Sequence, residues 1–222
     1  AAASRRWVAW LGVVALAGVV VQGILGGLRV VLLANHLAFV HGVFAHALLG
    51  FMASLALFTS RAWNEDVRPL PTALAGRLRA LCLFATAGIF VQIVLGAIVT
   101  HTSKRVDAHI GLAVVLSVLV PLLTQRVFVR LADWPHLTRP AGYLRAAWIV
   151  QLILGLGSYV ARFHGVEVPM APSLALALLV LHRLAAGWML ITALLLTLQV
   201  FRLSRPVGSA MTSDDITGRA VT

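Results

Sequence analysis

Long apolar runs separated by short polar connections dominate this chain. Six of the runs contain roughly 20 residues, the length that an α-helix needs to cross the hydrocarbon core of a membrane. We therefore expect an all-α fold, an integral membrane helical bundle with six transmembrane helices arranged as repeated helical hairpins. A single membrane domain would cover residues 1–206, and residues 207–222 would form a disordered cytoplasmic tail. The expected spans are Trp7–Leu32, Leu37–Phe58, Arg79–Val99, Ala108–Leu123, Leu144–Val160 and Ser173–Val200.

The three hairpins share a repeated motif. In each, a glutamine is followed four residues later by a glycine, and a histidine occurs in the next apolar run. The Gln-x-x-x-Gly spacing puts both residues on one helix face, about one turn apart. Because a buried amide and a buried imidazole are both costly in lipid, their recurrence at matched places suggests a shared internal ligand. The three copies are Gln22, Gly26 and His41; Gln92, Gly96 and His109; and Gln151, Gly155 and His182.

Composition excludes an ordinary soluble domain, since 60% of the 222 residues are apolar and the mean hydropathy is +0.95. The net charge of +11 could indicate nucleic-acid binding, but most basic residues gather at one end of the expected hairpins. The positive-inside rule explains this charge without a nucleic-acid partner and places both termini in the cytoplasm. That end carries Arg5, Arg6, Arg61, Arg68, Arg77, Arg79, Arg126, Arg130, Arg139, Arg145, Arg202 and Arg205, whereas the opposite connections carry Arg29, Lys104, Arg105 and Arg162.

Turn signals and the single cysteine add two constraints. Pro69 and Pro71 mark a turn in one long connection, and Pro135 and Pro140 mark a turn in the other. Cys82 lies within an apolar run, so neither an intramolecular disulfide nor a thiolate metal site is expected.

Three of the eight histidines are expected to lie at one depth. His41, His109 and His182 each precede an arginine of the basic end by 20 or 21 residues, which is roughly 30 Å along a helix. They would form a layer near the outer side of the bilayer. His46 lies about one turn deeper and points to a different face from His41, so we interpret it as a packing residue. The remaining histidines fall in predicted loops or at helix ends.

Haem is the ligand that best fits histidines from different helices of an apolar bundle. Two imidazoles can hold the flat macrocycle from both faces, and nearby glycines such as Gly26, Gly96 and Gly155 would give it room. The same glycines are also explained by close helix packing. Zinc is less well supported, because no carboxylate or thiolate accompanies the histidines at a ligand spacing. A proton or ion pathway would usually place an acidic residue inside a span, and none is found there.

The chain resembles haem A synthase, the membrane enzyme that oxidises the methyl group of haem O to the formyl group of haem A. The resemblance extends over essentially the whole chain up to about Arg205, and it depends on an ordered set of short motifs rather than on any single one. These motifs are Val21–Val30 (VQGILGGLRV), His41–His46 (HGVFAH), Val91–Thr102 (VQIVLGAIVTHT), Ala108–Ala113 (AHIGLA) and Leu181–Leu184 (LHRL).

The resemblance implies roles for individual residues. His109 and His182 would be the iron ligands of a haem b cofactor in the C-terminal half, and Arg183 would orient a propionate. His41 would be the catalytic residue, holding the iron of the haem O substrate. Members of the family have eight helices in two similar halves, and the first two helices, with an acidic residue and the partner of His41, have no counterpart here. The sequence would then be either truncated, which its start at Ala1 rather than Met favours, or a shortened paralogue with one complete haem site. Alone it would be a poor or inactive synthase.

Two other functions use the same residues. A b-type membrane cytochrome would only transfer electrons through the bis-histidine haem, and a non-catalytic assembly protein would use the histidines structurally. The synthase reading implies haem O, membrane lipid, a haem O synthase and an electron donor as partners, with an oligomer as a further option. It also implies the cell inner (plasma) membrane as location.

Overall fold

The computed structural model describes residues 6–65, 68–165 and 167–204, and every regular element in these ranges is a helix. Six helices are long and apolar enough to cross a membrane, which confirms the predicted all-α membrane bundle. They are α1 (Arg6–Val31), α2 (Asn35–Thr59), α4 (Thr72–Thr102), α5 (Val106–Arg130), α6 (Pro135–Phe163) and α7 (Pro172–Leu203); a short α3 (Arg61–Asn64) follows α2. The predicted tail, residues 207–222, lies outside the described residues.

The helices extend beyond the apolar runs from which they were predicted. The prediction that Pro135 and Pro140 mark a turn was wrong, because both lie in the first turns of α6. Pro135 is the first residue of α6, where a backbone N–H would have no partner within the helix. Its lack of an N–H therefore costs the helix no hydrogen bond. The helix continues through Pro140 because Leu137, Ala141 and Leu144 lie on one face and are fully buried.

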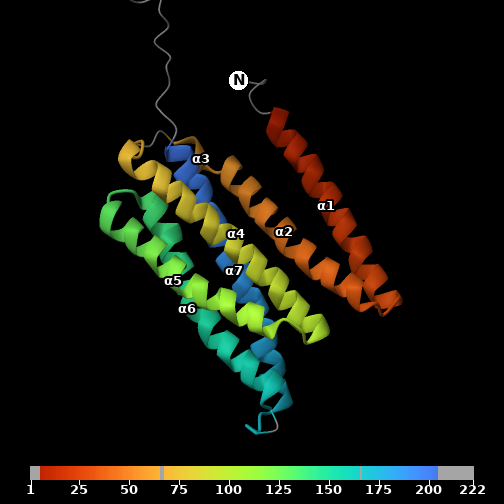
Figure 1. Ribbon diagram of the computed structural model, residues 1–222. Helices are drawn as coiled ribbons and strands as arrows, with labels where there is room; N and C mark the ends of the chain where they lie inside the picture. The colour runs from red at the N-terminus through yellow and green to blue at the C-terminus, as the bar shows by residue number, and fades with distance from the viewer. Residues whose placement is uncertain (1–5, 66–67, 166, 205–222) are drawn as a thin grey trace, which may run out of the picture.

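Helices α4 to α7 form a four-helix bundle, and the α1–α2 hairpin lies beside it (Figure 1). α2 packs against both α4 and α7, whereas α1 packs mainly against α2 and buries only Ala15. The described chain begins and ends at the same end of the bundle, which we call the basic end. The opposite end, with the short turns after α1 and α4, is the histidine end. Because successive membrane helices run in opposite directions, the three motif histidines all lie near the histidine end.

Tight packing is concentrated toward the basic end of the four-helix bundle. In α5 the buried residues begin at Leu116, and in α7 they begin at Ala185. Among the described residues, the histidine end has no comparable set, so the apolar core supports the motif histidines from one side. Fully buried members of the core include Val120, Leu123, Val127, Leu137, Leu144, Leu196 and Val200.

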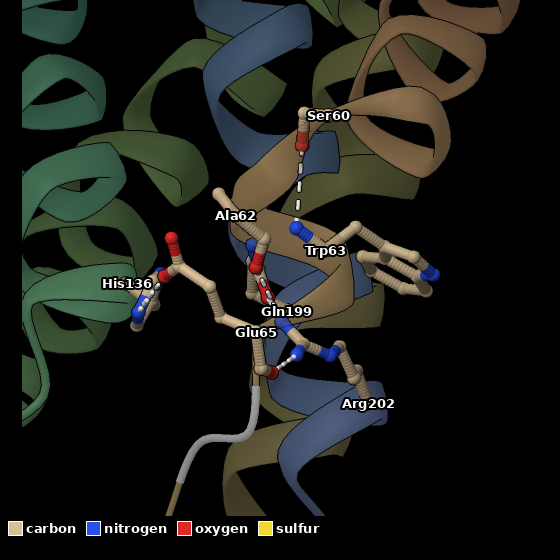
Figure 2. A network of polar contacts seen from close by, with 7 residues as sticks. All are labelled: Ser60, Ala62, Trp63, Glu65, His136, Gln199 and Arg202. Atoms are coloured by element: carbon tan, nitrogen blue, oxygen red, sulfur yellow. Dashed lines mark hydrogen bonds and ion pairs between the residues drawn. The ribbon is translucent and has the colours of Figure 1, made fainter.

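A polar network at the basic end attaches α3 to the bundle (Figure 2). Arg202 of α7 donates to the carbonyl oxygen of Ala62 at 2.7 Å and also to that of Glu65. Its guanidinium lies 5.3 Å from the ring centroid of Trp63, close enough for a cation–π contact. The Glu65 carboxylate lies 3.6 Å from His136 of α6. Two helices of the four-helix bundle, α6 and α7, thus hold α3 and Glu65.

The charge distribution predicts that the basic end faces the cytoplasm. With Cys82 replaced by serine, Ser103→Cys at the histidine end should react with a membrane-impermeant maleimide in intact cells, and Asp133→Cys at the basic end should react only after permeabilisation. Both positions are exposed in the structure. The parent without cysteine is the control, and the reverse labelling pattern would contradict the predicted orientation.

Candidate functional site

Each motif histidine lies against the motif glycine of its own hairpin. A Cβ atom added to Gly26, Gly96 or Gly155 would lie 3.1–3.2 Å from the Cε1 atom of the facing histidine ring. Such a distance is tighter than ordinary van der Waals contact, so a larger residue would displace the ring. The space directly beside each glycine is therefore occupied by an imidazole, as close helix packing would explain, and Gly96 and Gly155 also line a cavity. The facing rings are His41, His109 and His182, respectively.

The motif glutamines complete this arrangement. In all three hairpins the glutamine amide nitrogen approaches the histidine Nε2 at 3.4 Å, a long contact in which the amide donates to the ring. Gln92 also donates to the backbone oxygen of His109 at 2.9 Å, and Gln22 does the same to His41 at 3.3 Å. The geometry recurs although the partners are 19, 17 and 31 residues apart. Part of the repeat is thus explained by packing within each hairpin.

Packing within the hairpins does not satisfy every polar atom. In the described ranges, buried side-chain atoms without a hydrogen-bond partner are concentrated in this motif. An unpaired buried polar group costs roughly 1–3 kcal/mol, so several in one region call for a missing partner. They are the Oε1 atoms of Gln22, Gln92 and Gln151, the Nδ1 atoms of His41, His109 and His182, and Trp148 Nε1.

Two cavities lie beside the motif histidines. The first, which we call the α2 cavity, has a volume of about 360 Å³ and lies between α2 and the four-helix bundle. The second, the α5–α6 cavity, has a volume of about 390 Å³ and is lined by all four helices of that bundle. Both volumes are in the range of small-molecule pockets, roughly 300–1,000 Å³. Both cavities therefore lie at the histidine end, beside the motif residues.

His109 and His182 line both cavities, together with Gln92 and Gln151. The structure therefore brings together the two histidines predicted to act as a pair. His41 and Arg183 line the α2 cavity but not the α5–α6 cavity. His41 and Arg183 therefore lie on the α2 side of the histidine pair that the two cavities share.

Three residues of the α2 cavity were not predicted to belong to a site. His46, interpreted as a packing residue on another face, lines the same cavity as His41. His101 was placed at a helix end and Arg29 in a connection, yet both line this cavity along with Arg183. No acidic residue is among the described residues that line it, so the cavity is rich in cationic and imidazole groups and suits an anionic ligand.

The donor set suits haem better than a bare metal ion. The described ranges contain no group of three or more His, Cys, Asp or Glu side chains that could hold a metal ion. Haem iron needs only one or two protein ligands, and its macrocycle needs an apolar enclosure. His109 and His182 meet the first condition, and the leucine, isoleucine, valine and methionine side chains lining the cavities meet the second. Ligation through Nε2 requires release of the long glutamine contact.

Comparisons of the chain with family models, with curated proteins and with solved structures find no match.

Replacing a motif glycine tests whether the imidazole depends on the space beside it. Gly96→Leu should displace the His109 ring and destabilise the protein by about 1–3 kcal/mol, as overpacking commonly does. The measurement is the thermal midpoint in detergent. Gly111→Leu is the control on α5, because a Cβ at Gly111 meets nothing within 4 Å. Equal midpoints for the two variants would refute this role of Gly96.

Proposed function

We propose that this protein is a haem-binding membrane oxidoreductase similar to haem A synthase, with a haem b cofactor between His109 and His182 and haem O as substrate. The observation that carries the proposal is that these two histidines, from α5 and α7, line both cavities at the histidine end of the bundle. The proposed location is the inner (plasma) membrane. A haem O synthase would supply the substrate and an electron donor or acceptor would complete the redox reaction.

The cofactor would be held by Nε2 atoms of His109 and His182. When bound, haem supplies one-electron redox chemistry, and a six-coordinate iron favours electron transfer over oxygen activation. The protein contributes binding and orientation. Arg183 lines the α2 cavity and has no ion-pair partner among the described residues, so its guanidinium is available for a propionate carboxylate.

The substrate would occupy the α2 cavity, next to the cofactor. The resemblance assigns its iron ligand to His41, which lines that cavity from α2. Arg29 and Arg183 add positive charge for carboxylates, and the apolar side chains of α4 and α7 exclude water. Adjoining cavities would keep substrate and cofactor close enough for electron exchange.

The rival function, a b-type cytochrome, is favoured by the same bis-histidine pair and leaves the haem chemically unchanged. A non-catalytic assembly protein is the second rival, and it needs no haem. Spectroscopy of the bound haem separates the assembly protein from the other two. Analysis of haems extracted after co-expression with a haem O source separates the synthase from the cytochrome.

Haem binding tests the cofactor site directly. The purified chain should show the reduced-minus-oxidised spectrum of a low-spin haem, and His109→Ala and His182→Ala should each lower bound haem by about tenfold or more, because each removes one iron ligand. His36→Ala, at the exposed start of α2, is the control. Unchanged haem content in both ligand variants would refute the cofactor site. A chain that binds haem but yields no haem A or alcohol intermediate would favour the cytochrome.

A further inference from the structure

A groove at the basic end, between α4 and α5, shares no residue with the two cavities beside the motif histidines. It has a volume of about 340 Å³, and all the described residues that line it are arginines or leucines. The arginines are Arg77 of α4 and Arg126 and Arg130 of α5. α4 begins and α5 ends at this end of the bundle (Figure 1). We call this feature the basic groove.

The three arginines of the basic groove differ from their neighbours in having no partner. No hydrogen bond, ion pair or cation–π contact joins their guanidinium groups to another described residue. Other arginines at the same end are engaged within the protein. Arg202 donates to backbone carbonyls near α3, and Arg145 donates to Thr124 at 3.0 Å and lies 4.7 Å from the ring centroid of Phe128. Topology explains positive charge at this end, but it does not explain why three free guanidinium groups share one groove.

Nothing in the protein neutralises the charge of the basic groove. Asp133, the acidic residue nearest to Arg130 along the chain, does not line the groove, and the ion pairs of the described ranges involve histidines and glutamates only. The first turn of α4 contains no acidic residue, so the positive end of its dipole adds to the charge beside Leu74. Like charges that line one groove repel each other. A bound anion would remove this repulsion.

The depth of the groove suits a lipid headgroup. α4 has 31 residues, which is roughly 46 Å along a helix, whereas the hydrocarbon core of a bilayer is about 30 Å thick. The first turns of α4, with Arg77, therefore reach the headgroup level. Toward the membrane centre the groove becomes apolar, since Leu81 lines it one turn beyond Arg77. On α5 the exposed Leu122 and Val118 continue the face of Arg126 at four-residue steps. Positive charge above an apolar strip matches the profile of an anionic phospholipid.

We propose that the basic groove binds the headgroup of a diphosphate phospholipid such as cardiolipin, and that the acyl chains of this lipid lie along α4 and α5. Guanidinium groups bind phosphate oxygens in a bidentate manner, and basic pockets between membrane helices on the cytoplasmic side are suited to such headgroups. Two phosphates balance three arginines more fully than the single phosphate of phosphatidylglycerol does. The bilayer itself supplies the ligand. This inference goes beyond the proposed function and does not depend on haem.

Native mass spectrometry of the full chain in detergent, with equal amounts of cardiolipin and phosphatidylglycerol added, tests the site. The wild-type protein should retain cardiolipin in preference to phosphatidylglycerol. Arg126→Gln combined with Arg130→Gln should lower cardiolipin retention by about tenfold or more, because two phosphate contacts are lost. Arg61→Gln combined with Arg139→Gln is the matched control. Both control residues are exposed arginines near the basic end that do not line the groove, so the change in net charge is the same.

A second measurement and a second variant keep the test decisive if the double variant does not fold. Cardiolipin should raise the thermal midpoint of the wild-type protein more than phosphatidylglycerol does, since it binds the folded state. Arg77→Gln, on the other helix, should also lower cardiolipin retention severalfold. An equal loss of cardiolipin in the groove and control variants overturns the inference, because general charge then explains binding. Equal retention of both lipids by the wild-type protein, or unchanged retention in Arg77→Gln, overturns it as well.

Discussion

The contact between an imidazole and a glycine on the neighbouring helix is the constraint on which the rest of this structure depends. It sets the separation of the two helices in each hairpin and fixes the rotation of both about their axes. A larger residue at Gly26, Gly96 or Gly155 would meet the ring within about 3.2 Å of its Cβ atom. Since the same contact occurs three times, three hairpins with different connections present their histidines in the same way.

A consequence of this arrangement is that the bundle has two unlike halves. Toward the basic end, leucine and valine side chains of α5, α6 and α7 are fully buried and packed together. Toward the histidine end, two cavities and several unpaired polar atoms replace that core. The packed half supplies the apolar burial that stabilises the fold. The histidine end can therefore keep unpaired polar groups, whose cost the packed end offsets.

The sequence predicted the repeat and the number of long helices correctly, because both follow from local patterns. Hydropathy identifies a span without knowledge of its neighbours, and residue spacing along a helix gives depth. The boundaries were less accurate, since charged helix ends such as Arg77–Arg79 and Arg126–Arg130 do not resemble lipid-facing segments. Pro140 was assigned to a turn because prolines are common in turns. The helical spacing of the apolar residues around it was given less weight.

Residues such as His46, His101 and Arg29 were not assigned to the site because their grouping depends on how helices cross. His46 and His41 point in different directions from α2, and only the positions of α4 and α7 decide that one cavity reaches both. Likewise, the sequence could not show whether a glutamine faces a ligand or its own histidine. The three contacts at 3.4 Å favour the histidine.

The three motif pairs also differ in how much chain separates them. Gln151 and His182 are 31 residues apart, yet they meet at the same distance as the pair separated by 17. In the α6–α7 hairpin, the longer stretch of chain between the two residues therefore does not change how they face each other. A fluorophore or an affinity tag could therefore be inserted directly after Phe163, since extra residues there would not change the contact between Gln151 and His182.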